Sequence, residues 1–332
     1  MLASKALELT PAAATALAAR IVAGRLHAQA LAAGGKVAEA ISARQAAVDI
    51  GNAGVAAAIT TGVPASSELL ANAALCEFES ISQGPGGLGG PGQLPGLVRA
   101  AERLEAAMRA DGSQWGRNVS VVATAATIRR VLAELDPDMA GKGVHLGAGL
   151  AWAERALDLD GSCADAVAEL GLLARMTGQA ERMQSALAQL SAWVAGSGGG
   201  VPPVRVALGM AKLRVALAKA VPAQGSEMLA AADADFVKAL QASGGASEYA
   251  LAIMMGRIEV AFTLSLMTGE PQHLATTAAL LDAGLASFGA GTPEEAQLLA
   301  TWINVAANGV LTMPGEAGKY AQLLAKHSAA VV

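Results

Sequence analysis

The tripeptide Met-Thr-Gly occurs twice in the chain, ending at Gly178 and at Gly269, and both copies lie in the same apolar pattern. Apolar or small residues follow each glycine at five, nine, twelve and sixteen positions, a spacing that marks one face of an α-helix. Apolar residues also stand two and five positions before each glycine. These residues are Leu173, Met176, Met183, Leu187, Leu190 and Val194 in the first copy and Leu264, Met267, Leu274, Ala278, Leu281 and Leu285 in the second. Each copy therefore predicts an αα-hairpin whose glycine ends the first helix in the left-handed conformation.

The composition extends this prediction to the whole chain. Of its 332 residues, 53% are hydrophobic, only 15% are charged and 3% are aromatic, so a core must be built from Ala, Leu, Val and Met, of which Ala, Leu and Met are strong helix formers. Alternating β-branched runs with hairpin turns are missing from the sequence, and the nearest candidate, from Val119, leads into a helical pattern. We predict an all-α fold, an irregular array of antiparallel helical hairpins that forms either an α-solenoid or a helical bundle.

Two stretches rich in Gly and Pro interrupt the helical pattern, because neither residue suits a helix interior. They divide the chain into an N-terminal helical block at 1–82, a linker or loop at 83–96, a middle block at 97–195, a second loop at 196–203 and a C-terminal block at 204–332. Whether the blocks are separate domains or parts of one stack stays open. The first stretch lacks the Lys-Ser/Thr ending of a phosphate-binding loop, and we expect it to be a surface connection.

The middle block resembles a tetratricopeptide repeat. The helix ending at Ala156, Leu157 and Leu159, the pair Leu170-Gly171 and the turn at Gly178 match positions of that family, and a second, weaker match places small residues at Ala40 and Ala47. The chain departs from the family at Val167, Ala174 and Gly161, and the small position of the C-terminal copy is Phe262. The two turn glycines are 91 residues apart, which is not a multiple of the family's period of about 34 residues. The resemblance implies stacked hairpins of irregular length.

Threonine-proline pairs signal two helix starts. Thr10 and Pro11 predict the start of an ordinary first helix, although an organelle transit peptide is an alternative for this arginine-containing segment. Thr292 and Pro293, with Glu295 three residues after the cap, predict a capping box, and Asn308-Gly309 is expected to close that helix.

Charge, cysteine content and hydropathy constrain partners and location. A net charge of −5 argues against a nucleic-acid partner, and the arginines between 99 and 109, which alternate with Glu102 and Glu105, predict a solvated helix face. The long uncharged stretches at 50–67 and 296–315 are broken by polar residues, Gly and Pro, so we expect no integral membrane span. With no secretory pattern and only Cys76 and Cys163, the chain is expected in a reducing compartment, the cytoplasm or an organelle interior, although one disulfide stays open.

Catalytic and metal-binding patterns are weak. The four histidines, His27, His145, His273 and His327, show no ligand spacing, and Cys163 is expected to be a small residue in a turn. The most enzyme-like stretch runs from Asp136 to Gly149, where Asp136 and Asp138 are either paired carboxylates or the end of one helix and the start of the next. We predict no catalytic residues, no metal and no cofactor.

The sequence favours a non-enzymatic scaffold that binds a protein partner through stacked hairpins. A structural subunit of a larger multiprotein complex, self-association into a homo-oligomer, and an all-helical enzyme or small-ligand binder remain as alternatives. Asn304 and Trp302, on the helix that starts at Pro293, are the predicted binding residues. Asn304 can donate and accept at once, and Trp302 either anchors a partner or lies in the core.

Overall fold

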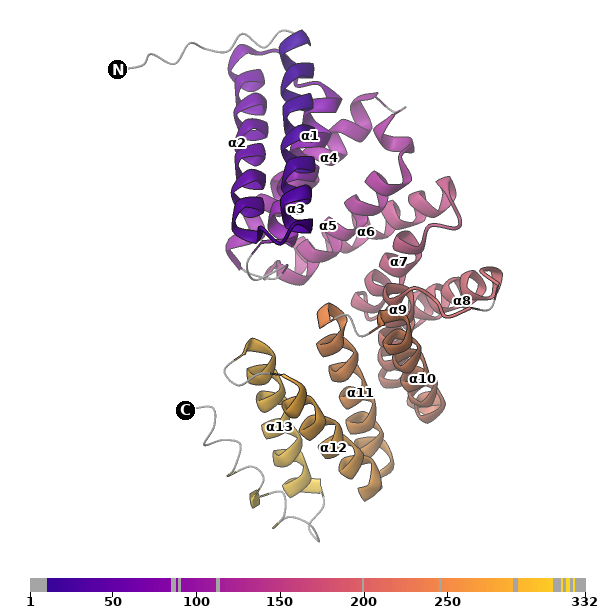
Figure 1. Cartoon of the computed structure of the whole chain (residues 1–332). Coiled ribbons are helices and arrows are strands. Elements are labelled where there is room, and N and C mark those ends of the chain that lie inside the picture. The colour runs from indigo at the N-terminus through magenta and orange to yellow at the C-terminus, as the bar shows by residue number, and fades with distance from the viewer. Residues whose placement is uncertain are drawn as a thin grey trace. The chain divides into compact units, whose positions relative to one another are not determined.

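The computed structural model consists of helices that pack in consecutive antiparallel pairs (Figure 1). It describes residues 11–84, 88, 91–111, 114–198, 200–244, 247–288, 292–312, 318, 321–322 and 325. Over these residues the structure contains thirteen α-helices, three short 3-10 turns and no β-strand. The all-α prediction and the irregular array of hairpins are thereby confirmed.

The chain forms two compact units, 1–169 and 170–332, and the boundary lies inside a helix. That boundary does not coincide with either of the Gly/Pro-rich stretches, so the five predicted segments stay a prediction. The first stretch is also shorter than expected, because Leu94–Gly96 already belong to a helix. The middle of that stretch, at 85–87 and 89–90, lies outside the described residues.

In the first unit each helix packs against the next, from α1 to α6. Its helices are α1 (Pro11–Ala33), α2 (Val37–Thr61), α3 (Ser67–Ser82), α4 (Leu94–Asp111), α5 (Val119–Leu135), α6 (Met139–Leu159) and the start of α7 (Ala164–Met176). Its 3-10 turns are η1 (Pro91–Gln93) and η2 (Trp115–Arg117).

The second unit continues the same pairing from α8 to α13. Its helices after α7 are α8 (Ala180–Gly196), α9 (Val204–Ala220), α10 (Gly225–Ser243), α11 (Ser247–Thr268), α12 (Pro271–Ser287) and α13 (Pro293–Thr312), with η3 (Pro222–Gln224) between α9 and α10. In addition to the consecutive pairs, α9 contacts α11 and α11 contacts α13. The alternate helices α9, α11 and α13 therefore form one row.

The two Met-Thr-Gly turns have the predicted geometry. Gly178 and Gly269 adopt φ values of 67° and 69°, and each lies between two helices, α7 and α8 in one case and α11 and α12 in the other. The preceding threonine has the same role in both turns. The Thr177 hydroxyl donates to the carbonyl of Ala174 at 2.7 Å and accepts from the Gln179 amide at 3.2 Å.

In the second turn, the Thr268 hydroxyl donates to the carbonyl of Leu264 at 2.9 Å and accepts from the Glu270 amide at 3.2 Å. In both hairpins, threonine thus links the last turn of the first helix to the residue after the glycine. This shared role accounts for the repeat of the tripeptide.

The predicted helix starts are present. α1 begins at Pro11, although its cap Thr10 lies outside the described residues, and the Thr292 hydroxyl accepts from the Glu295 amide at 3.2 Å at the start of α13. The predicted end of α13 is wrong, because the helix continues through Asn308-Gly309 to Thr312. A single glycine costs a helix about 1 kcal/mol but does not by itself end it.

Buried ion pairs join neighbouring helices of the first unit. Glu77 on α3, of which 4% of the side chain is exposed, contacts Arg103 of α4 at 3.1 Å. Glu105 on α4 contacts Arg129 of α5 at 2.6 Å. The prediction of a solvated face on α4 holds for Arg99, Glu102 and Arg109 and is wrong for Glu105 and Arg103, which lie mostly inside the helix stack.

One helix of the described chain, α11 over Tyr249–Thr268, is long and apolar enough to cross a membrane by length and composition, with a mean hydropathy of 1.6 and 33% of the stretch buried. Arg257 and Glu259 on this helix form ion pairs with Asp233 at 2.8 Å and Lys219 at 2.6 Å. α11 also packs against α10 and α12 along the chain. Together with its contacts to α9 and α13, it is an apolar helix with four neighbours and a partly uncovered surface.

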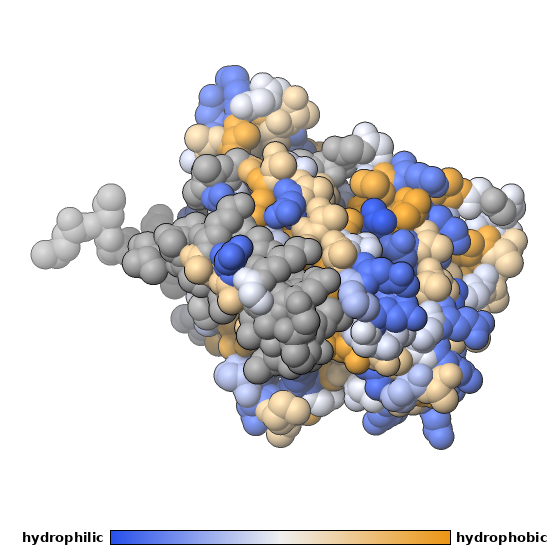
Figure 2. Space-filling model, turned by 90° about the horizontal axis from the view of Figure 1, so that it is seen from below, coloured by the Kyte–Doolittle hydropathy of each residue, from blue (hydrophilic) through white to orange (hydrophobic). Residues whose placement is uncertain are grey.

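On the visible face of the space-filling view, hydrophobic and hydrophilic residues are interspersed over the described part of the chain (Figure 2). Large hydrophobic side chains that are exposed, such as Leu26, Ile59 and Met139, are scattered over several helices. Isolated exposed apolar residues are ordinary in soluble proteins. A binding site must therefore be sought where apolar and polar groups are arranged together.

Candidate binding groove

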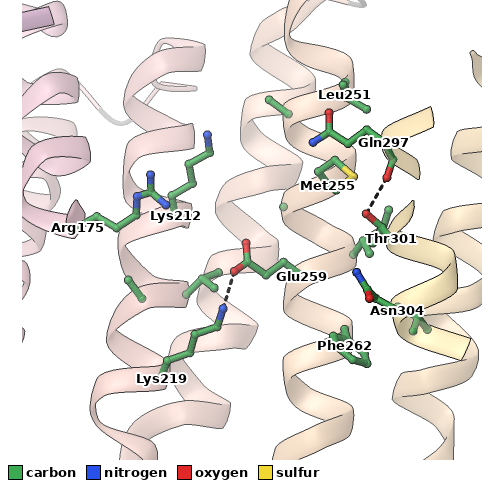
Figure 3. A pocket seen from close by; sticks show the side chains of 16 residues that line it. Arg175, Lys212, Lys219, Leu251, Met255, Glu259, Phe262, Gln297, Thr301 and Asn304 are labelled. Atoms are coloured by element: carbon green, nitrogen blue, oxygen red, sulfur yellow. Dashed lines mark hydrogen bonds and ion pairs between the residues drawn. The ribbon is translucent and has the colours of Figure 1, made fainter. Parts of the chain in front are cut away.

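A hollow of about 840 Å³ lies on the second unit. Its lining comes from α9, α11 and α13, the row of alternate helices, with one residue from α7 and none from α8, α10 or α12 (Figure 3). We call it the α11 groove because α11 runs along its floor between α9 and α13.

The floor of the α11 groove is apolar. Leu251, Met255, Ile258 and Phe262 follow the spacing of four, three and four, so they share one face of α11. Ile258 is buried, whereas Leu251, Met255 and Phe262 are half-buried and open to the groove. A ligand that covers this apolar surface removes it from water, which lowers the free energy and so favours binding.

One wall of the groove is basic. Arg175, Lys212 and Lys219 come from α7 and α9, and the single carboxylate among the sixteen lining residues is Glu259. Lys219 and Glu259 form an ion pair at 2.6 Å, with about half of each side chain exposed. The Nε of Arg175 is buried without a hydrogen-bond partner among the described residues. Three cations and one anion give the groove a positive charge, although the chain as a whole carries −5.

The opposite wall presents neutral polar groups from α13. Gln297, Thr301 and Asn304 lie four and three residues apart and face the groove (Figure 3). The Thr301 hydroxyl donates to the carbonyl of Gln297 at 2.9 Å and retains lone pairs that can accept. This wall can hydrogen-bond amides without contributing charge.

The two predicted binding residues occupy different environments. Asn304 is exposed and lines the α11 groove, while Trp302 is completely buried in the core between α11, α12 and α13. The indole Nε1 of Trp302 donates to the carboxylate of Asp282 at 3.1 Å. Of the two alternatives for Trp302, the structure shows the core one. Its buried ring fixes the helix that carries Asn304.

In the enzyme-like stretch around Asp136, the two aspartates lie at the ends of helices. Asp138 caps α6 by accepting from the amides of Ala140 and Gly141, and Asp136 accepts from the Asp138 amide at 2.9 Å. Asp136 also faces His145 Nε2 at 3.4 Å. Burial, and after it the neighbouring Arg129, lowers the pKa of His145. Asp136 therefore ends α5, and Asp138 starts α6.

The hollow between α2, α3 and α4 of the first unit offers a contrast. Its volume is about 290 Å³, about a third of that of the α11 groove, and its charged lining residues are one cation and one carboxylate, Arg99 and Glu77. Glu77 is already in contact with Arg99 and Arg103. The charges in this hollow are thus satisfied within the chain.

The cysteines and the acidic side chains point to no further chemistry in the described residues. Cys76 and Cys163 are both free thiols, and burial raises the pKa of Cys76 to about 11, which keeps it a protonated thiol. Within the described ranges, His, Cys, Asp and Glu side chains do not gather in a group of three or more that could hold a metal ion.

Sequence reasoning singled out Asn304, which lines the groove, but not Arg175, Lys212, Lys219 or the floor. These residues come from helices far apart in the chain, and their distances along the sequence carry no local pattern. One residue in the sequence indicated that the second hairpin packs differently. Phe262 stands where the first hairpin has Gly171, and a large apolar residue at a position suited to a small one marks a place where the helix packing differs.

Comparisons with known proteins add little to this geometry. No protein-family model matches the chain, and no curated protein matches it significantly. Among solved structures, the S. pombe nuclear import adaptor Nro1 is similar with 9% sequence identity and a TM-score of 0.40, over 95% of this chain and 99% of that one. At this identity and TM-score, the likeness carries no argument about function.

Proposed function

We propose that the protein is a non-enzymatic protein–protein interaction scaffold and that the α11 groove holds a segment of a partner protein. The observation that carries the proposal is the pairing of an apolar floor with two polar walls in one open hollow of about 840 Å³. The tetratricopeptide-like turn at Gly178 supports the proposal, because helical-hairpin arrays form extended binding surfaces from alternate helices.

The shape of the groove suits a polypeptide. Its floor extends from Leu251 to Phe262, about 16 Å along a helix that rises 1.5 Å per residue. That length matches about three turns of a helical segment or about five residues of an extended one. The neutral wall of Gln297, Thr301 and Asn304 offers donors and acceptors along this length, as polar groups of a partner segment require.

Two alternatives make different predictions. A volume of 840 Å³ also falls within the range of about 300–1,000 Å³ seen for small-molecule sites, so a ligand binder would co-purify with a small molecule. A permanent subunit of a larger complex would not behave as a monomer when expressed alone. We propose a reducing compartment, the cytoplasm or an organelle interior, for the scaffold, since its two cysteines are free thiols.

The experiment that tests the scaffold is site-specific photocrosslinking in the cells from which the protein derives. The photoreactive p-benzoylphenylalanine replaces Phe262 in the groove, and in the matched control it replaces Leu240, which is 46% exposed on α10 outside the groove. We expect a discrete crosslinked protein from position 262 and none from position 240.

The substitution Asn304→Trp, which fills the groove from its exposed rim, should abolish that crosslink. Equal products from both positions, or a product that persists in the Asn304→Trp variant, contradict the proposal. A crosslink to a second copy of the chain assigns the groove to self-association instead.

A further inference from the structure

We infer that the partner segment held by the α11 groove is acidic as well as apolar, with its carboxylates toward α7 and α9 and its apolar side chains on α11. This inference rests on the proposed function and goes beyond it by naming the chemistry of the partner. Three features of the groove carry it.

The first feature is the imbalance of charge. The lining holds three cationic side chains, Arg175, Lys212 and Lys219, and one carboxylate, Glu259. The α11 groove is therefore positively charged, although the chain as a whole carries a net charge of −5. Charges of one sign that line a cleft with low-dielectric walls focus the field and attract ligands of the opposite sign.

The second feature is the incomplete hydrogen bonding of Arg175. Its Nε is buried and has no hydrogen-bond partner among the described residues. Two half-buried arginines elsewhere contact carboxylates, Arg129 with Glu105 at 2.6 Å and Arg214 with Asp235 at 2.9 Å. Buried polar atoms are rarely left unsatisfied in folded proteins. A carboxylate from outside the chain would give the Arg175 guanidinium the partner that its counterparts have.

The third feature is the exposed pair of Lys219 and Glu259. About half of each side chain is open to water, and exposed ion pairs contribute little to stability. Glu259 occupies the place on α11 where a partner carboxylate would meet Lys219, since both residues line the groove (Figure 3). A bound acidic segment would therefore compete with Glu259 for Lys219, and removing the Glu259 charge should favour binding.

The direction of the segment's side chains follows from the two walls. The basic residues lie on α7 and α9, the apolar floor lies on α11, and the neutral amides and hydroxyl lie on α13. A segment with carboxylates on one side and apolar side chains on the next would satisfy the basic wall and the floor together. Its backbone amides would then face Gln297, Thr301 and Asn304.

The probes for the test are peptides taken from a random 12-residue display library. The library is selected on the full chain and depleted on the Asn304→Trp variant, so that the retained peptides depend on the groove. We expect the retained peptides to carry Asp or Glu next to Leu, Ile, Phe or Met. Their affinities are then measured by fluorescence anisotropy.

Charge reversal gives the quantitative readout. The double variant Lys212→Glu/Lys219→Glu should bind the retained peptides about tenfold more weakly, and Glu259→Gln should bind them about twofold more tightly. The matched control is Arg155→Glu/Arg182→Glu, which changes the net charge equally at two exposed positions outside the groove. Its affinity should be unchanged. Thermal unfolding verifies that each variant is folded.

The outcomes separate the two proposals. Retained peptides that lack acidic residues, or equal effects of the two double variants, overturn the acidic partner while leaving the groove as a peptide site. Displacement of the peptides by single-stranded DNA assigns the basic wall to nucleic acid and also overturns it. A selection that retains no groove-dependent peptide overturns the proposed function itself.

Discussion

The two Met-Thr-Gly hairpins, α7–α8 and α11–α12, share their turns and differ in how their first helices pack. Both turns place glycine at positive φ, and in both the threonine hydroxyl accepts from the amide after the glycine and donates to a carbonyl of the preceding turn, three residues back at Ala174 and four residues back at Leu264. Seven residues before the glycine, α7 has Gly171 and α11 has Phe262. A side chain at Gly171 would begin 3.1 Å from Leu190 of α8, whereas Phe262 lines the α11 groove.

A second difference lies nine residues before the glycine, where α7 has Glu169 and α11 has Val260. Glu169 is completely buried and accepts from Arg130 Nε of α5 at 2.7 Å, while Val260 is an ordinary apolar residue that packs against α10. The comparison teaches that the turn residues specify a hairpin, whereas single residues on the helix faces decide whether neighbouring helices close together, form a buried ion pair or leave a groove.

The largest effect is expected from breaking the buried ion pair of the first hairpin. Glu169→Ala leaves Arg130 in the core without its buried partner. Loss of one partner of a buried ion pair lowers the free energy of unfolding by about 3–5 kcal/mol. The matched control is Glu134→Ala, which removes the other partner of Arg130, at 2.8 Å and 41% exposed, and should cost less than about 1 kcal/mol. Urea unfolding measures both, and equal effects would show that Glu169 does not distinguish the hairpins.

The next effect tests the close packing at Gly171. Gly171→Phe gives the first hairpin the residue that the second hairpin has at this position. The ring would overlap Leu190, and overpacking of this kind lowers the free energy of unfolding by about 1–3 kcal/mol. Gly143→Phe on α6 is the control, since a side chain there would meet nothing within 4 Å. If the free energy of unfolding falls equally in both variants, close approach of α7 and α8 does not explain the glycine.

The shared turns should respond alike to a smaller change. Gly178→Ala and Gly269→Ala each force alanine into the left-handed region, which should lower the free energy of unfolding by about 1–2 kcal/mol. A Cβ at either position would meet no neighbour within 4 Å, so no clash adds to this cost. Gly143→Ala, within a helix, should instead stabilise by up to about 1 kcal/mol. Thermal unfolding of the three variants tests the equivalence of the turns, and a loss at only one of them would break it.

The smallest effect concerns the neutral wall of the groove. Asn304→Ala should weaken binding of the partner segment by about 1 kcal/mol, the value of one lost hydrogen bond, and should leave the fold intact because Asn304 is exposed. Gln241→Ala, another exposed amide on α10, is the control. Calorimetric titration with a groove-dependent peptide measures both, and unchanged affinity in Asn304→Ala removes this residue from the site.

Local rules predicted the hairpins well because their determinants are adjacent in sequence. Thr177, Gly178 and the apolar face of α8 all lie within twenty residues. The buried role of Glu105 could not be predicted in this way. Its partner Arg129 lies 24 residues away on the next helix, and a charged residue between arginines looks the same in sequence whether it faces water or a neighbouring helix.

The groove escaped prediction for the same reason. Its walls combine α7 and α9 with α13, and only the stacking of alternate helices makes Arg175 and Thr301 line the same hollow. Asn304 was proposed from a local signal, a neutral amide that interrupts an apolar helix, and its role in binding stays a prediction. The burial of Trp302 was left open, since an aromatic residue in an amphipathic helix suits a core and a binding surface equally.

The central claim is that the floor of the α11 groove is open in the free protein and covered by a partner segment. Cysteine labelling tests it most directly, with Met255→Cys on the floor and Leu266→Cys as the control, a position on the same helix that is 52% exposed and outside the groove. Cys163→Ser removes the accessible native thiol, and Cys76, buried and with a pKa of about 11, stays unreactive.

We predict that both introduced thiols react with a maleimide in the free protein. A groove-dependent peptide at ten times its dissociation constant should slow the reaction of Met255→Cys roughly tenfold and leave that of Leu266→Cys unchanged. A thiol at position 255 that does not react in the free protein, or whose rate the peptide does not change, contradicts the claim.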